Sequence, residues 1–237
     1  MSYAPAFPHD PIEAIAPDVF MARGSIKMNA LMTITRNMAV VRHDGELTLV
    51  DPIRLSADEE KRLEGLGTIA RILRLGSMHG LDDAYYMDRY GAELWAPGLS
   101  DAYPEPKATL LWDEETPLPF PDARLFKIDG VPQDDGALLL SRGKGLLLTC
   151  DAIQNYGDYS HNNLFARIMM PLIGFKKTTI LGPMWIKMMT PEGGSLEGEF
   201  RRLLELEFDA LLSAHGTFLP TGAHAAVTAA VDRVYAG

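Results

Sequence analysis

The sequence predicts an α/β fold in which two β-sheets pack face to face and helices cover their outer faces, an αββα sandwich of four layers. The order of elements along the 237 residues leads to this prediction. Strands come first, strand and helix then alternate, strands return, and the chain ends with helix, strand and helix. Amphipathic elements in this order bury their apolar sides when two sheets lie between two helical layers. A chain of this length buries a sufficient core as one unit, so we expect a single domain over residues 1–237.

The first half of the chain reads as strands with two short helices. Segments rich in Val, Ile, Leu and Thr predict strands at 18–22, 31–43, 46–50, 69–75 and 93–96. The turn sequence His-Asp-Gly at 43–45 predicts a hairpin between the second and third of these strands. Ser56 with Glu59 three residues later is the pattern of a capping box and predicts a helix start. A second helix passes through Tyr85 and ends at Gly91.

The second half contains further strands and a segment of different composition. Residues 97–123 are rich in Pro and acidic residues and predict a long surface connection. Strands are expected at 124–128, 137–140, 145–149 and 208–214, and helices at 196–206, with Ser195 as N-cap, and at 223–235. The segment at about 152–194 is rich in Met, Phe and Trp. We expect it to be an apolar helical insert that packs on the body of the domain or on a second subunit.

Charge and composition exclude several classes of protein. The net charge of −10 disfavours a nonspecific nucleic-acid binder. No run of about 18 apolar residues predicts a membrane span, and the N-terminal residues lack a signal-peptide pattern. The single cysteine, Cys150, excludes intramolecular disulfides and favours a reducing cytoplasm. We therefore expect a cytoplasmic protein with a small-molecule substrate or ligand, no nucleic-acid or membrane partner, and a homodimer contact through the Met-rich insert.

Polar side chains that are able to bind metals follow three predicted strands. His79, Asp82 and Asp83 lie in the loop after the strand at 69–75, Asp151 follows the strand at 145–149, and His215 follows the strand at 208–214. Strand ends converge at one edge of a sheet, so these residues are predicted to share a cleft. Imidazoles and carboxylates together suit zinc or iron. Each residue also has a structural explanation: a helix cap, a turn cap, or a hydrogen-bonded histidine at a strand end.

The order of these features resembles the metallo-β-lactamase superfamily over about residues 18–236. VDP at 50–52 stands where that family's early strand ends in Asp. LLLTCDAI contains the counterpart of the family's Gly-Asp, with Cys150 in place of Gly, and LLSAHGTF contains its final His-Gly. The loop SMHGLDD stands at the family's His-x-His-x-Asp-His motif but keeps one histidine and an acidic pair. Val131 replaces the histidine of the family's Gly-His pair, and a valine cannot bind a metal.

The resemblance implies the αββα metallo-β-lactamase-like fold and a reduced metal site. Its implied ligands are His79, Asp82, Asp83, Asp151 and His215, which would hold at most one Zn, Fe or Mn ion. Asp82 and Asp83 would also act catalytically by orienting the attacking water or accepting its proton. The implied activity is hydrolysis of a small ester, thioester, amide or lactone. The alternative is a non-catalytic protein that binds a ligand or partner in the same cleft, because several family ligands are replaced.

Overall fold

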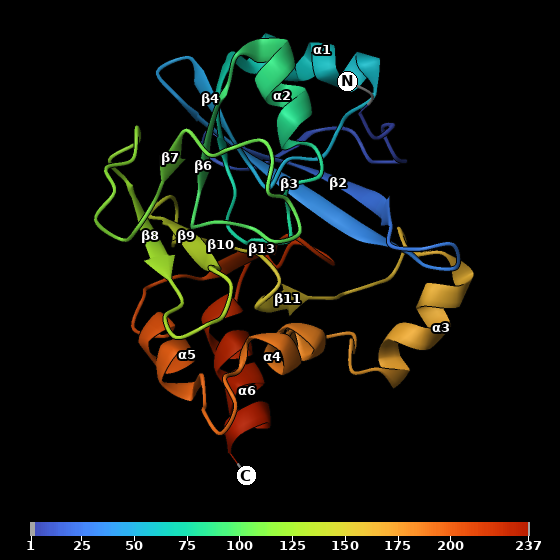
Figure 1. Ribbon diagram of the computed structural model, residues 1–237, viewed down its shortest axis with the longest axis vertical. Helices are drawn as coiled ribbons and strands as arrows, with labels where there is room; N and C mark the ends of the chain where they lie inside the picture. The colour runs from blue at the N-terminus through green and yellow to red at the C-terminus, as the bar shows by residue number, and fades with distance from the viewer. Residues whose placement is uncertain (1–2, 237) are drawn as a thin grey trace.

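The computed structural model describes residues 3–236 and contains two large sheets stacked between helices (Figure 1). The larger sheet has seven strands in chain order. They are β1 (Glu13–Ala16), β2 (Val19–Lys27), β3 (Thr33–His43), β4 (Glu46–Val50), β5 (Thr68–Leu73), β6 (Glu93–Ala96) and β7 (Leu110–Leu111). β1 to β4 pair antiparallel, whereas β4 to β7 pair parallel. The helices α1 (Ala57–Leu66) and α2 (Asp83–Tyr90) form the crossovers that the parallel pairs β4–β5 and β5–β6 require.

The second sheet has four strands in the order β13-β10-β9-β8. They are β8 (Ala123–Lys127), β9 (Gly136–Leu140), β10 (Leu146–Thr149) and β13 (Ala210–Ser213). A separate ribbon pairs β11 (Ile153–Asn155) with β12 (Thr179–Leu181). The later helices are α3 (Leu164–Leu172), α4 (Pro183–Met189), α5 (Glu197–Leu203) and α6 (Ala223–Tyr235). Among residues 3–236, no helix is long and apolar enough to cross a bilayer.

Alternating side chains bury both faces of each sheet. Met38 and Val40 of β3 pack in the layer beneath α1 and α2, while Ala39 and Val41 pack between the two sheets. The second sheet repeats this arrangement and turns its outer face toward α4, α5 and α6. Figure 1 shows the helical layers on opposite sides of the stacked sheets, with α3 standing apart at one edge. The predicted αββα arrangement is confirmed.

Several local predictions differ from the structure. The short strands β1, β7, β11 and β12 were not predicted, and the segment at 152–194 is therefore not wholly helical. The capping box at the start of α1 is wrong: the Ser56 side chain makes no cap hydrogen bond, and Glu59 accepts from the backbone N–H of Ile12 instead. α5 has Leu196 at its N-cap position, although the Ser195 hydroxyl oxygen accepts from the backbone N–H of Glu197.

Candidate metal centre

Three of the predicted site residues meet at one edge of the sandwich. His79 Nε2 lies 3.3 Å from one carboxylate oxygen of Asp151, and His215 Nε2 lies 3.1 Å from the other. The two imidazole rings meet edge to face, with their centroids 5.0 Å apart. The residues follow β5, β10 and β13 respectively. The structure thus brings together these residues from separate strands, as their positions at strand ends predicted.

A backbone carbonyl sets the orientation of His215. Its Nδ1 lies 2.6 Å from the carbonyl oxygen of Thr35, so Nδ1 donates a proton to an atom that only accepts. Nε2 then presents a lone pair toward the Asp151 carboxylate in the neutral ring. Two acceptors at this distance repel each other unless a proton or a metal cation lies between them. A histidine that donates Nδ1–H to a carbonyl and offers Nε2 is also the usual arrangement of a metal ligand.

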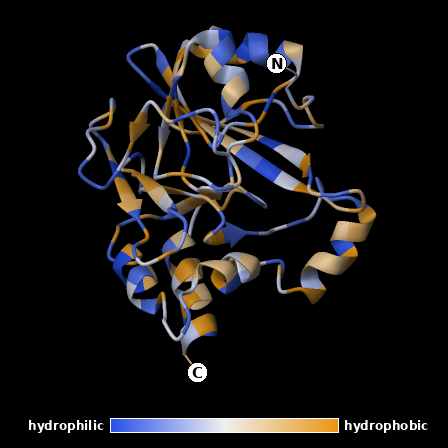
Figure 2. Cartoon of the chain, viewed as in Figure 1, coloured by the Kyte–Doolittle hydropathy of each residue, from blue (hydrophilic) through white to orange (hydrophobic). Residues whose placement is uncertain are grey.

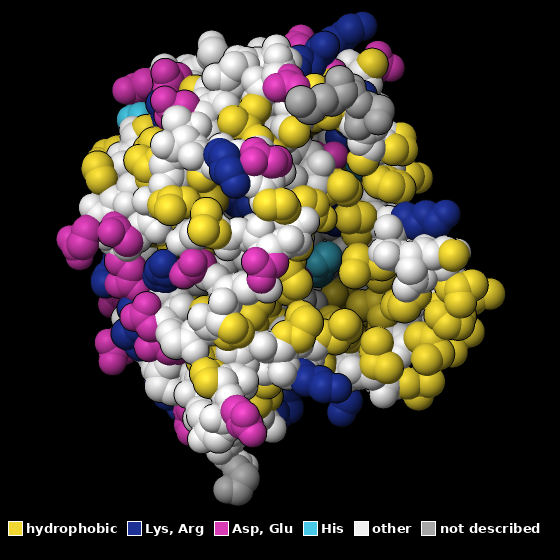
Figure 3. Space-filling model, in the orientation of Figure 1, with side chains coloured by type: hydrophobic (Ala, Val, Ile, Leu, Met, Phe, Trp, Pro, Cys, Tyr) yellow, Lys and Arg dark blue, Asp and Glu magenta, His cyan; other side chains and the backbone are white. Residues whose placement is uncertain are grey.

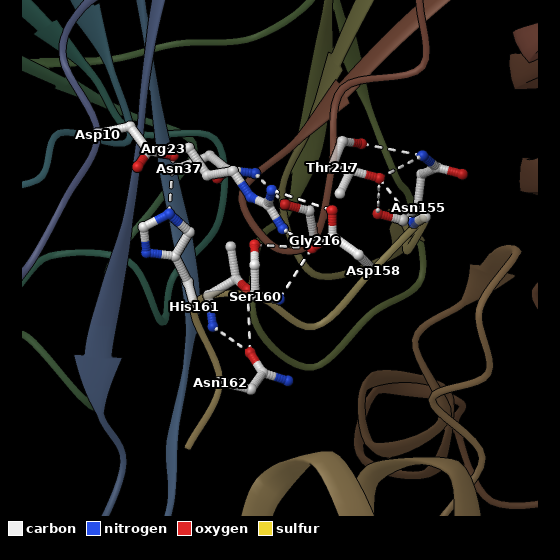
Figure 4. A network of polar contacts seen from close by, with 12 residues as sticks. Asp10, Arg23, Asn37, Asn155, Asp158, Ser160, His161, Asn162, Gly216 and Thr217 are labelled. Carbon is white, nitrogen blue, oxygen red and sulfur yellow. Dashed lines mark hydrogen bonds and ion pairs between the residues drawn. The ribbon is translucent and has the colours of Figure 1, made fainter. Parts of the chain in front are cut away.

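The loop after β13 is held by a polar network that joins distant parts of the chain (Figure 4). Asn37 on β3 donates to the carbonyl oxygens of Ser213 and Gly216, which flank His215. The Asn155 amide donates to the carbonyl oxygen of Thr217, on the far side of the same turn. These bonds fix the backbone on both sides of the histidine, so the imidazole is positioned before any ligand binds.

The protonation state of Asp151 suits a metal ligand. Burial raises the pKa of Asp151, but His79 and His215 beside it have the greater effect and hold that pKa well below its usual range. Burial lowers the pKa of His215, and the hydrogen bond and charge of Asp151 raise it above its ordinary value. Asp151 is consequently ionised at neutral pH, and an ionised carboxylate is the form that binds a metal.

The spacing of the donor atoms fits a single small cation. Two atoms that each bind a tetrahedral metal at about 2.1 Å are separated by about 3.4 Å. His79 Nε2 and His215 Nε2 lie 3.3 and 3.1 Å from different oxygens of Asp151, distances close to this value. The ligand atoms of all three residues lie within 4.8 Å of one another. Two imidazole nitrogens and one carboxylate form a set that is typical of mononuclear Zn or Fe sites.

The structure does not bring Asp82 and Asp83 to this group. An oxygen of Asp82 accepts from Arg36 at 3.1 Å, and an oxygen of Asp83 accepts from the Nε of Arg74 at 2.8 Å. All four side chains are buried. Burial raises the pKa of Asp83 to about 6 against the lowering effect of Arg74, so Asp83 is ionised at neutral pH. The two arginines thus balance the carboxylates that the sequence assigned to a metal, and this placement does not support a ligand or catalytic role for either aspartate.

A second group of potential metal ligands shares His79 with the first. Asp51, His79 and Cys150 also place potential ligand atoms within 4.8 Å of one another. Asp51, however, accepts from the backbone N–H of Leu75, and burial raises its pKa. Burial also raises the pKa of the Cys150 thiol well above its ordinary value, so the thiol stays protonated and is a poor metal ligand at neutral pH. We assign the donor set to His79, Asp151 and His215.

Two further histidines of the second half of the chain, His161 and His224, lie outside this group. His161 Nε2 is 2.8 Å from an oxygen of Asp10, next to the ion pair of Arg23 with Asp158 (Figure 4). His224 Nε2 lies 2.8 Å from the carbonyl oxygen of Leu204. Both histidines therefore have hydrogen-bond partners of their own outside the group.

The group of His79, Asp151 and His215 lines a mostly apolar cavity of about 220 Å³. Besides the three residues of the group, its more polar lining residues are Arg36, Gln154, Tyr103 and Tyr156. The remaining wall is aliphatic, thioether or aromatic and comprises Ile26, Met28, Ile34, Met78, Phe175, Met184, Trp185 and Met188. The positions of Phe175, Met184 and Met188 agree with the expectation that the Met-rich segment packs on the body of the domain. Arg36 and Tyr103 were missed because nothing in their sequence surroundings marks them.

We expect a substitution at Gly216 to destabilise the turn that carries His215. Gly216 has φ +88°, and an added Cβ would lie 2.0 Å from the carbonyl oxygen of Asn155. Gly143 has φ +63° with open space around it and is a matched control. Gly143→Ala should lower the free energy of unfolding by about 1–2 kcal/mol through the left-handed backbone alone. Gly216→Ala should lower the free energy of unfolding by more than Gly143→Ala does, and urea denaturation of both variants would measure the difference. Equal losses would contradict the close contact.

Comparison with known proteins identifies the fold. The DIM-1 metallo-β-lactamase superposes with a TM-score of 0.66 at 12% identity, over 96% of this chain and 98% of its own. FIM-1 from Pseudomonas aeruginosa, in its mono-zinc form, superposes with a TM-score of 0.62 at 12% identity, over 97% of this chain and 98% of its own. The metallo-β-lactamase from Erythrobacter litoralis superposes with a TM-score of 0.60 at 14% identity, over 93% of this chain and 90% of its own. No protein-family pattern matches the sequence, and no curated protein is similar to it at the sequence level. At these identities the similarity establishes a divergent metallo-β-lactamase fold.

Proposed function

We propose, from its metallo-β-lactamase fold, that this chain is a hydrolase that uses one metal ion to cleave a small ester, thioester, amide or lactone. The observation that carries the proposal is the group of His79, Asp151 and His215 at the wall of an apolar cavity. The similarity to FIM-1 in a mono-zinc form supports a single-metal site on this fold. The pairing of Asp82 and Asp83 with arginines supports it further, because it leaves one compact donor set.

His79, Asp151 and His215 would hold the metal. When bound, the metal supplies Lewis acidity, which lowers the pKa of a water molecule and polarises a carbonyl group. The ionised Asp151 contributes a negative charge that stabilises the cation, and the Thr35 carbonyl keeps the Nε2 of His215 available.

Two further side chains at the cavity are suited to stabilise charge on the substrate. Arg36 is buried, lines the cavity and is held by Asp82 and by the carbonyl oxygen of Pro52. Burial raises the pKa of Tyr103, so its hydroxyl stays protonated as a donor. Donors held in place before reaction stabilise the negative oxygen that develops when a carbonyl is attacked. We assign this role to Tyr103 and a supporting electrostatic role to Arg36.

The wall of the cavity indicates the kind of substrate. Met78, Phe175 and Trp185 offer no charged group to a bound molecule, and methionine side chains adapt to varied apolar shapes. A substrate with an apolar acyl group fits this lining better than a charged one. The thioether and aromatic side chains also exclude bulk water, which strengthens the electrostatic interactions inside.

A metal-depletion assay tests the proposal. The protein would be stripped with a chelator, reloaded with Zn, Fe(II) or Mn, and assayed on p-nitrophenyl esters of increasing chain length, a thioester and a lactone. We expect hydrolysis only after reloading, with kcat/KM rising with acyl length. His161→Ala, which removes an imidazole outside the group, should retain activity. A metal-loaded protein that hydrolyses none of these substrates but binds the esters would favour the non-catalytic alternative.

Tyr103→Phe separates chemistry from metal binding. We expect kcat to fall by about 100- to 1,000-fold because one donor to the developing oxyanion is lost. The metal content should be unchanged, since Tyr103 is not part of the donor set. Parallel elemental analysis and steady-state kinetics would check both statements. An unchanged kcat would remove Tyr103 from the mechanism without affecting the metal site.

A further inference from the structure

An apolar face surrounds the mouth of the cavity. Helix α3 exposes Leu164 at 73%, Ile168 at 58% and Leu172 at 74%, while its buried side is formed by Ala166 and Met170. Figure 2 shows α3 as hydrophobic along most of its length, and Figure 3 shows hydrophobic side chains gathered on the side of the molecule where α3 lies. Single exposed apolar residues are ordinary on a protein surface, but a continuous group of this kind marks a contact site.

The face extends beyond α3 to two neighbouring segments. The hairpin between β2 and β3 exposes Met28 and Leu31, and α4 exposes Met184 and Met188. The side-chain amide of Asn163, at the start of α3, donates to the carbonyl oxygen of Leu31, which joins the helix to the hairpin. We call the surface formed by the exposed apolar residues of this hairpin, α3 and α4 the docking face.

Cavity and docking face are continuous. Met28, Met184 and Met188 line the cavity and are also about half exposed. In Figure 3 a histidine side chain is visible at depth in a hollow that hydrophobic side chains border. A molecule that enters the cavity from this side therefore passes over the docking face.

The charge around the docking face is opposite to that of the whole chain. The protein has 32 acidic and 22 basic side chains, yet the segments 19–43 and 159–191 contain no Asp or Glu. Lys27, Lys176, Lys177 and Lys187 lie in these segments, are exposed, and make no ion pair with any residue in 3–236. Apolar side chains bordered by unpaired lysines on an otherwise acidic protein complement a surface that is apolar inside and negatively charged outside.

We propose that the docking face binds the surface of an anionic lipid bilayer, with α3 in the headgroup region and the mouth of the cavity toward the membrane. The lysines would contact lipid phosphates, and the exposed Leu and Ile side chains would enter the acyl boundary. A two-fold dimer through the same face would bring the lysines of one copy against those of the other, which disfavours self-association. This proposal replaces the sequence-based expectation of no membrane partner, which rested on the lack of a spanning segment.

The substrate class follows if the hydrolase proposal holds. A cavity that opens toward lipid and has apolar walls admits an amphiphilic ester or thioester whose acyl chain arrives from the bilayer. This substrate class rests on the proposed function, whereas the docking itself does not. Vesicle binding is therefore measured without any activity readout, so that failure of one proposal is distinguishable from failure of the other.

Co-sedimentation with vesicles tests the docking. The full chain is expected to pellet with vesicles of phosphatidylcholine plus phosphatidylglycerol, and weakly or not at all with phosphatidylcholine alone. Added salt should reduce the bound fraction, because the attraction between lysines and anionic lipid is screened. Replacing Lys176 and Lys177 by Glu should weaken partitioning by at least about 25-fold, because each lysine near an anionic surface contributes about 5-fold. Lys144→Glu, in the turn between β9 and β10, should have little effect.

A second variant tests the apolar part. This variant replaces Leu164, Ile168 and Leu172 together by Gln, which is also a good helix former. We expect it to partition into vesicles at least about tenfold more weakly than the wild type. Leu99→Gln is the matched control, since Leu99 is 76% exposed but lies in the 97–109 connection away from the docking face. Circular dichroism verifies that the variants are folded. Equal vesicle binding by the wild type and the triple variant, or no binding by the wild type, would overturn the proposal. A wild-type dimer that the triple variant converts to a monomer would assign the face to self-association instead.

Discussion

Asp151→Asn is expected to weaken metal binding by at least about 100-fold and to lower metal-dependent hydrolysis with it. The substitution keeps the shape of the side chain but removes the negative charge between two imidazoles. Loss of an outer-shell partner alone costs about 10- to 100-fold in metal affinity, and we expect at least about 100-fold here because a direct ligand is changed. Metal titration by isothermal calorimetry and assays of the reloaded protein would measure the effect.

A matched control for this substitution lies a few residues along the chain. Asp158 pairs with Arg23 at the molecular surface and does not touch the group, so Asp158→Asn should bind metal as the wild type does. Unfolding curves of both variants would show whether either loses its structure. A metal affinity in Asp151→Asn equal to that of the wild type would show that the ion is held elsewhere.

Arg74→Met is expected to destabilise the protein by about 3–5 kcal/mol without changing the donor set. Arg74 and Asp83 form an ion pair at 2.6 Å, with 3% and 0% of their side chains exposed. Removing the arginine leaves the Asp83 carboxylate buried without its counter-charge, which is the most costly way to break such a pair. Urea denaturation measures the loss, and the double variant Arg74→Met with Asp83→Leu should recover much of it.

The stability lost in Arg74→Met should depend on pH in a definite direction. Burial already raises the pKa of Asp83 to about 6 in the wild type, and loss of Arg74 raises it further. A carboxyl whose folded pKa lies above its unfolded value contributes stability at low pH and loses it as pH rises through the folded pKa. The destabilisation of Arg74→Met should therefore be smaller near pH 4 than at pH 7. The same loss at both pH values would contradict a buried charge as its cause.

The sequence predicted the layers of the fold because periodic apolar residues mark which faces are buried. β3 illustrates this: alternating residues of MAVV at 38–41 fill two different cores. β7 and β11 were missed because they have two and three residues, too few to show a period. Pairing with a neighbouring strand, which is a tertiary contact, is what makes them strands.

The candidate site, like the fold, was predicted only in part from the sequence. His79, Asp151 and His215 were found because polar residues at the ends of apolar strands gather at one edge. Asp82 and Asp83 were assigned to the metal because their counter-charges are remote: Arg36 is 46 residues from Asp82 in the chain. Arg74 is only nine residues from Asp83, yet the pairing depends on how the loop turns before α2. Side-chain partners of this kind are set by tertiary packing.

The metal content of the purified chain tests the central claim most directly. Elemental analysis of protein prepared without chelator, and again after loading with Zn, Fe(II) or Mn, would give the number of ions per chain. We expect one ion per chain after loading and none in His215→Ala, with His224→Ala unchanged. Two ions per chain would show that a second donor set, such as that of Asp51 and Cys150, also binds metal. No metal under any loading condition would contradict the metal site and the hydrolase proposed on it.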